Sequence, residues 1–85
     1  MRFRSCDVRV GDRIVWYKKG SAVPQLEVVI ITVDHDDMKW THLCVSNPHR
    51  PEYVGEFYTT PGTVVRESWE TVWGDAEIVS RIGDA

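Results

Sequence analysis

The chain has 85 residues, a net charge of −3 and a hydrophobic fraction of 42%, which is the balance of one small folded domain. Its longest aliphatic run, residues 28–31, is far shorter than the roughly 20 residues of a membrane span. Residues 1–5 carry positive charge without the apolar segment of a signal peptide behind them. We therefore expect one cytoplasmic domain over residues 1–85 that does not bind a membrane. In this compartment Cys6 and Cys44 are expected as reduced thiols, with a single disulfide between them as the alternative.

Charge is distributed unevenly along the chain. Residues 1–20 contain six Arg and Lys against two Asp, whereas residues 21–85 contain four Arg and Lys against eleven Asp and Glu. This asymmetry predicts a molecule with one basic and one acidic side. The alternative is that strands from the two parts lie side by side and their charges mix.

Residues 7–17 predict a strand, a tight turn at Gly11–Asp12 and a second strand, because apolar residues alternate on both sides of the turn. Residues 18–21 break this pattern. Residues 25–34 are rich in β-branched side chains at positions of both parities, which favours a strand covered on both faces. We predict that this segment is the central strand.

The acidic residues 34–37 predict a hairpin turn, so residues 38–45 should form the antiparallel neighbour of the central strand. Residues 46–51 contain two prolines and predict a loop. A further strand is expected over residues 53–59, with Gly55 as a bulge, before a turn at residues 60–62. The segment 63–73 fits either a strand or a short helical turn, and residues 76–82 alternate as a closing strand.

Five or six short strands separated by frequent turn signals predict an all-β fold, and at this length a small, partly open, antiparallel SH3-like barrel. Closing the sheet would hide strand edges that otherwise pair with other chains. The expected core consists of Val10, Ile14, Val28, Ile30, Val33, Leu43, Val45, Phe57, Val65, Ile78 and Ile82.

The run Val10-Gly11-Asp12-Arg13-Ile14-Val15, followed by a basic turn and a long apolar strand, resembles the opening of SH3-like barrel modules of the KOW and Tudor type. The likeness covers about 25 residues. It implies that exposed aromatic residues and loop charges bind nucleic acid or a protein segment. In size, and in the lack of targeting and catalytic motifs, the chain is also similar to accessory proteins of bacterial viruses.

The acidic part of the chain contains several aromatic residues, and Trp and Tyr inside a charged rim are typical of protein interfaces. We therefore predict a non-catalytic module that binds a larger protein through this surface, or another copy of itself through a sheet edge. The alternative for Trp69 and Trp73 is a place in the core. The predicted contact residues are Tyr53, Tyr58, Trp69, Glu70, Trp73 and Asp75.

The basic N-terminal strands support a second hypothesis, in which aromatic rings stack on bases while Arg and Lys contact phosphates. The residues that would bind nucleic acid are Arg9, Arg13, Trp16, Tyr17, Lys18 and Lys19. The isoelectric point near 5.5 argues against strong binding of this kind. The alternative is that these cations form an ordinary solvated face over a buried Trp16.

Metal and enzyme sites are not expected. His42, Cys44 and His49 are possible zinc ligands, beside the acidic turn 34–37, but their spacing matches no standard zinc motif. Cys44 with a nearby histidine resembles a nucleophilic pair in composition only. We predict no cofactor, no metal and no catalytic residues.

Overall fold

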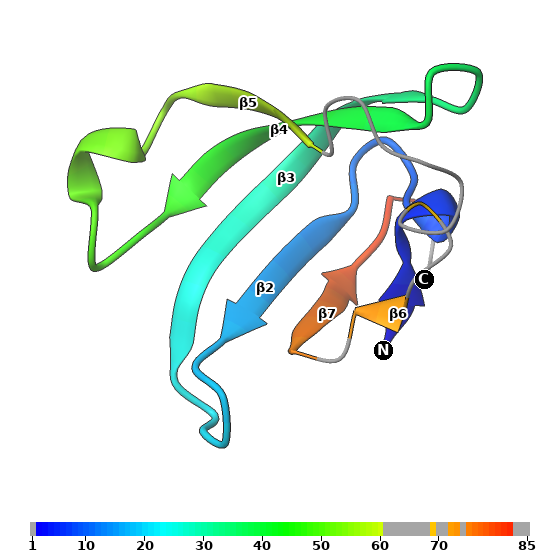
Figure 1. Ribbon diagram of the computed structural model, residues 1–85. Coiled ribbons are helices and arrows are strands. Elements are labelled where there is room, and N and C mark those ends of the chain that lie inside the picture. The colour runs from blue at the N-terminus through cyan, green and yellow to red at the C-terminus, as the bar shows by residue number, and fades with distance from the viewer. Residues whose placement is uncertain (1, 61–68, 70–71, 74, 83–85) are drawn as a thin grey trace.

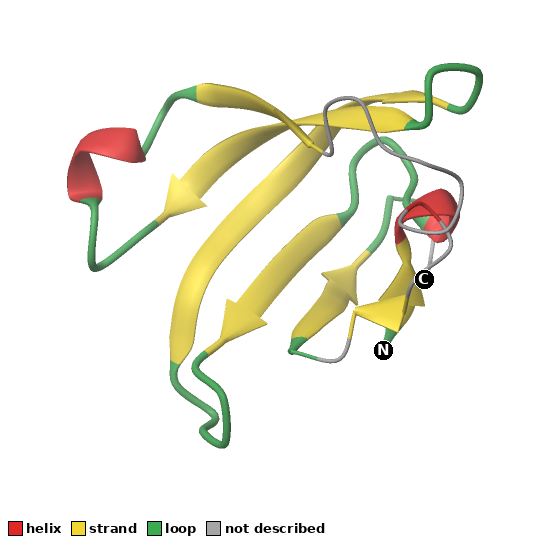
Figure 2. Ribbon diagram, in the orientation of Figure 1, coloured by secondary structure: helices red, strands yellow, loops and turns green. Residues whose placement is uncertain are grey.

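The computed structural model describes residues 2–60, 69, 72–73 and 75–82 (Figures 1 and 2). Five antiparallel strands form one bent sheet in the order β5-β4-β3-β2-β7, and a short pair, β1-β6, lies on the β7 side. The all-β expectation is confirmed in this part of the chain. Within it the ladder does not return from β5 to β7, so the sheet is not closed into a barrel. The strands are β1 (Phe3–Arg4), β2 (Arg13–Tyr17), β3 (Pro24–Asp34), β4 (Lys39–Ser46), β5 (Phe57–Thr60), β6 (Val72–Trp73) and β7 (Ala76–Ser80).

Strand β3 is central, as predicted, and pairs with β2 on one side and β4 on the other. The predicted hairpin turn before β4 is also present. The Asp34 carboxylate accepts hydrogen bonds from the backbone N–H groups of Asp36 and Asp37, both at 3.0 Å, which closes the turn. Met38 belongs to this turn, with φ of 55°, so β4 begins one residue later than expected.

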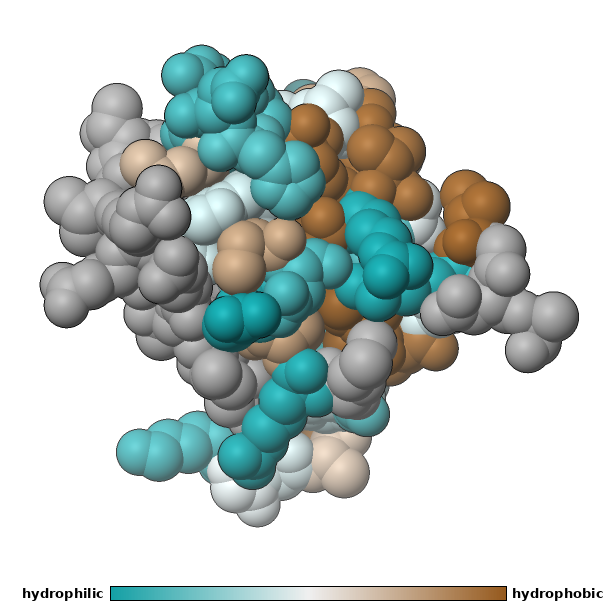
Figure 3. Space-filling model, turned by 90° about the vertical axis from the view of Figure 1, so that its right-hand side faces the viewer, coloured by the Kyte–Doolittle hydropathy of each residue, from teal (hydrophilic) through white to brown (hydrophobic). Residues whose placement is uncertain are grey.

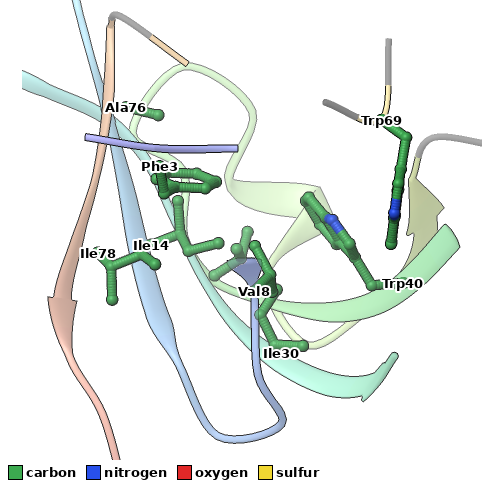
Figure 4. Packing of buried hydrophobic residues seen from close by; sticks show 9 residues of the cluster. Phe3, Val8, Ile14, Ile30, Trp40, Trp69, Ala76 and Ile78 are labelled. Atoms are coloured by element: carbon green, nitrogen blue, oxygen red, sulfur yellow. The ribbon is translucent and has the colours of Figure 1, made fainter. Parts of the chain in front are cut away.

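The core lies between the concave face of the sheet and the β1 segment, and Figure 4 shows its side chains converging there. Four of the predicted core residues, Ile14, Val28, Ile30 and Ile78, are buried. Five residues outside the expected core set complete the cluster. These are Phe3, Val8, Trp40, Trp69 and Ala76.

The register of β3 and β4 explains which face of β4 is buried. Val28 lies opposite Cys44 and Ile30 lies opposite His42, so these four side chains share the core face. Leu43 and Val45 have the opposite parity and are only half-buried, contrary to their expected core position. Val33 is also half-buried, packed against the cluster, and Val65 lies outside the described residues.

Three further core predictions are wrong, because Val10, Phe57 and Ile82 are 58%, 61% and 81% exposed. Val10 lies in a turn rather than in a strand. Phe57 lies on the outer face of an edge strand, and Ile82 follows the end of β7. The Ile82 side chain packs against Gly11. A Cβ atom added to Gly11 would lie 2.4 Å from the Cδ1 atom of Ile82.

The predicted strand over residues 8–10 is replaced by a 3-10 helix over Ser5–Asp7 and a turn over residues 9–12. The Asp12 carboxylate accepts the Arg9 N–H at 2.8 Å, and the Asp12 N–H binds the Arg9 carbonyl at 3.1 Å. Gly11, with φ of 90°, then donates its N–H to the carbonyl of Ile30 at 2.8 Å. A carboxylate that binds its own turn competes with strand pairing at this point.

The strand expected over residues 53–59 begins only at Phe57. Pro51 starts a 3-10 helix over Pro51–Tyr53, and Gly55 has φ of 89°. The Cys44 carbonyl accepts the Gly55 N–H at 2.9 Å, and the Cys44 N–H binds the Glu56 carbonyl at 3.0 Å. Gly55 and Glu56 on one strand are therefore both paired with Cys44 on the other, which is the predicted bulge at Gly55.

The last predicted segments are described in part. The closing strand is present as β7 and ends at Ser80. Of the ambiguous segment 63–73, the structure describes Trp69 and the strand β6, whose Trp73 backbone pairs with Phe3. Of the loop predicted for residues 46–51, residues 47–50 are confirmed, because Ser46 ends β4 and Pro51 begins a 3-10 helix.

Candidate functional site

A row of aromatic rings runs along β4 and β5 from the core to the surface. The ring centroids are 5.2 Å apart between Trp40 and His42, 5.9 Å between His42 and Tyr58, and 5.8 Å between Tyr58 and Tyr53. Trp40 and His42 are buried, whereas Tyr53 and Tyr58 are about two-fifths exposed. Tyr58 therefore packs against a buried ring, and Tyr53 packs against Tyr58.

Two carboxylates flank these tyrosines. Glu52 belongs to the 3-10 helix Pro51–Tyr53, and Glu56 immediately precedes β5. Desolvation, followed by the negative charge of Glu56, raises the pKa of Tyr58 above its usual 10.0, and Glu52 adds to this effect. Arg50 lies 3.9 Å from Glu52, with both side chains well exposed, so this ion pair is weak. We call Glu52, Tyr53, Glu56, Phe57 and Tyr58 the edge-strand surface.

Of the four predicted protein-binding residues whose side chains the structure describes, two are brought together. Tyr53 and Tyr58 are in ring contact, but Trp69 is 5% exposed and its ring packs edge-on against His35. Trp69 is thus a core residue and not a surface anchor. Asp75 is exposed in the turn before β7, on the other edge strand of the sheet. Glu70 and the Trp73 side chain lie outside the described residues.

Sequence reasoning missed Phe57 as a surface residue. The alternation of residues 53–59 predicts apolar side chains on the buried face of a strand, and Phe57 was counted among them. In the structure Phe57 lies opposite Leu43, which in turn lies opposite Val29, on the outer face of the sheet. The turn signals of Pro51 and Gly55 were the features that could have indicated a short, exposed edge strand.

The predicted nucleic-acid residues are gathered in part at the β2–β3 hairpin. A hollow of about 1120 Å³ is lined by Tyr17, Lys18 and Lys19, together with Arg2 from the basic N-terminal segment. Asp75 and Glu77 line the same hollow, so its charge is mixed. Figure 3 shows the molecule turned by 90°, with hydrophilic residues at the top, in the middle and at the bottom of this face and hydrophobic residues gathered on its right.

The other three predicted cations and rings have different positions. Arg9 lines a second hollow of about 430 Å³, which shares Arg2 with the first. Arg13 forms an ion pair with Glu27 at 3.1 Å. Trp16 is half-buried against the core. Arg2, Arg9, Lys18 and Lys19 therefore line two hollows that share Arg2, whereas Arg13 lines neither of them.

The possible zinc ligands are not brought together. His42 and Cys44 share the core face of β4, but His49 lies in the exposed loop after β4. Within the described residues there is no group of three or more His, Cys, Asp or Glu side chains placed to hold a metal. Both cysteines are free thiols, and burial raises the pKa of the Cys44 thiol above its usual 9.0.

His42 should make the stability of the domain depend on pH. Its imidazole is buried, its Nδ1 atom has no hydrogen-bond partner among the described residues, and desolvation lowers its pKa below the usual 6.5. As the pH falls below about 6.5 the unfolded chain takes up a proton that the folded chain resists, so stability is present at neutral pH and declines on acidification. Melting temperatures measured from about pH 7.5 to about pH 5.5 should fall less steeply for His42→Phe than for wild type.

The matched control for this prediction is His49→Gln, which changes an exposed imidazole and should keep the wild-type pH slope. Equal slopes in His42→Phe and wild type would show that His42 remains as easily protonated in the folded state as in the unfolded chain.

Within the described residues no helix has the length and apolar character needed to cross a membrane. No protein-family model, curated protein or solved structure matches this chain.

Proposed function

We propose that this chain is a non-catalytic, cytoplasmic protein-binding module that docks on a larger partner through the edge-strand surface. The observation that carries the proposal is the aromatic row. Tyr53 and Tyr58 present partly exposed rings that contact each other, and the Tyr58 ring also contacts the buried His42 ring, which packs against Trp40. Rigid aromatic anchors lose little conformational entropy on binding, which is why they dominate interface energetics.

The strand order supports a partly open SH3-like barrel as the scaffold of this module. Strands β2 to β5 follow one another as neighbours, and β7 returns to pair with β2 on its other side. This arrangement leaves β5 at one end of the ladder. The scaffold would thus present the edge-strand surface on a short strand whose inner side is anchored by β4.

The proposal predicts which substitutions abolish partner capture from a nuclease-treated lysate. Tyr53→Ala/Tyr58→Ala should lose the bound protein, because truncating anchors of this kind weakens binding by roughly 2 kcal/mol or more each. The control Lys18→Gln/Lys19→Gln changes two exposed charges in the β2–β3 hairpin, outside the edge-strand surface, and should retain it. Undiminished capture by the tyrosine variant would refute this function.

A second candidate function is nucleic-acid binding, favoured by the hollow that gathers Arg2, Tyr17, Lys18 and Lys19. If this function is correct, the Tyr53→Ala/Tyr58→Ala variant should retain its bound partner. Capture would be sensitive to nuclease, would weaken steeply with salt, and would be lost in Lys18→Gln/Lys19→Gln. The acidic residues Asp75 and Glu77 in the same hollow make this the weaker of the two proposals.

A further inference from the structure

The pairing of β4 with β5 determines which backbone groups of β5 face outward. Cys44 and Glu56 are joined by a backbone hydrogen bond, and bonded pairs alternate along an antiparallel ladder. In the observed register the next bonded pair is therefore His42 with Tyr58. The backbone N–H and C=O groups of Phe57 and Thr59 then point away from β4.

Among the described strands β4 is the only neighbour of β5, so these outward groups form an open edge. Natural edge strands are commonly protected by Lys or Pro residues. β5 has the sequence Phe-Tyr-Thr-Thr and carries neither. An extended peptide could therefore add to this edge through main-chain hydrogen bonds, with side-chain contacts supplying specificity.

The charges beside the edge indicate which side chains such a peptide would carry. Glu56 has no ion-pair partner among the described residues, and the partner of Glu52, Arg50, is distant and exposed. The lowered pKa of His42 keeps the ring beneath Tyr58 neutral near pH 7. Two partly exposed tyrosine rings and two carboxylates are thus clustered beside β5, a combination that attracts cationic side chains.

We infer that β5 accepts, as an added strand, an extended peptide segment with Lys or Arg at alternate positions. Alternate residues of a strand point to the same face, so such a segment would direct its cations toward Tyr58, Tyr53 and Glu56 while its other residues lie beside Phe57 and Thr59. This inference rests on the proposed function and names the chemistry of the partner segment and its mode of binding.

The test uses fluorescent ten-residue peptides that alternate Lys with Thr, compared with peptides in which Glu replaces each Lys. The lysine peptide should bind, and the glutamate peptide should bind on the order of tenfold more weakly or not at all. Methylating the two peptide N–H groups that face β5 should weaken binding on the order of tenfold or more, whereas methylating the alternate N–H groups should have little effect. Scanning both alternate sets identifies which set faces β5.

Two variants of the protein complete the test. Glu56→Gln should weaken the lysine peptide, whereas the control Asp75→Asn removes one exposed acid from the opposite edge of the sheet and should not. Thr59→Pro removes an outward backbone N–H without removing a backbone donor to β4, although it also removes the hydroxyl that lies 3.3 Å from the Thr41 hydroxyl. It should also weaken binding while circular dichroism confirms the fold. The methylated peptides require no change in the protein. They therefore still test backbone pairing with β5 if the proline variant fails to fold.

Failure to bind the lysine peptide, equal binding of both peptides, or indifference to both methylation patterns would overturn the inference. If the tyrosine variants still lose their partner from lysate, the proposed function stands and only the mode of binding is wrong. If the tyrosine variants keep their partner, the proposed function fails as well.

Discussion

Replacing Asp12 with alanine is expected to lower the free energy of unfolding by about 3–5 kcal/mol. The Asp12 carboxylate is 1% exposed and forms a bidentate ion pair with Arg81. The Arg81 Nε atom lies 3.0 Å from one carboxylate oxygen, and a terminal guanidinium nitrogen lies 3.1 Å from the other. Arg81 also donates to the Asp7 carbonyl at 2.7 Å. This network ties the end of β7 to the start of β2, and its loss leaves a largely buried guanidinium without its counter-ion.

The matched control is Arg13→Gln, which breaks the ion pair with Glu27. Its length of 3.1 Å is nearly the same, but the Arg13 side chain is 47% exposed, so the loss should be at most about 1 kcal/mol. Urea unfolding of both variants measures the difference. If the two variants lost similar amounts of unfolding free energy, burial would not explain the stabilising effect of the Asp12–Arg81 pair.

Ile30→Ala should lower the free energy of unfolding by about 2–5 kcal/mol, because it removes methyl and methylene groups from the centre of the core and leaves a cavity. Ile30 is 1% exposed, whereas its neighbour Ile31 is 38% exposed on the opposite face of β3. Ile31→Ala is therefore the control, and a surface substitution of this kind should change stability by less than about 1 kcal/mol. An unchanged urea midpoint in Ile30→Ala would contradict the core described above.

The central strand was predictable because every side chain from 28 to 33 is β-branched, a local property that needs no knowledge of neighbouring strands. The buried face of β4 was not predictable in the same way. Residues 40–45 contain apolar side chains at both parities, and the pairing of Cys44 with Val28 decides which parity is inside. Register of this kind depends on contacts between strands and cannot be inferred from one strand alone.

The candidate site was predicted only in part, for two physical reasons. Tyr53 and Tyr58 were identified because aromatic residues near acids are typical of interfaces, but the same pattern included Trp69, which the fold buries. The sequence predicts a core position for Phe57 because it is an apolar residue within a predicted strand. Its exposure arises because β5 is the edge strand, and which strand ends the sheet depends on pairing between distant segments. The Asp12–Arg81 pair joins residues 69 positions apart, and nothing in the local sequence of either residue indicates it.

The central claim is that partners dock at β5, and site-specific photo-crosslinking tests it most directly. A benzophenone amino acid can replace Phe57 on β5, or Val79 on β7, two exposed apolar residues on the opposite edge strands of one sheet. After irradiation in nuclease-treated lysate, position 57 should form a discrete crosslink to a protein partner, and position 79 should not. A crosslink from position 79 alone, or none from position 57, would contradict the claim.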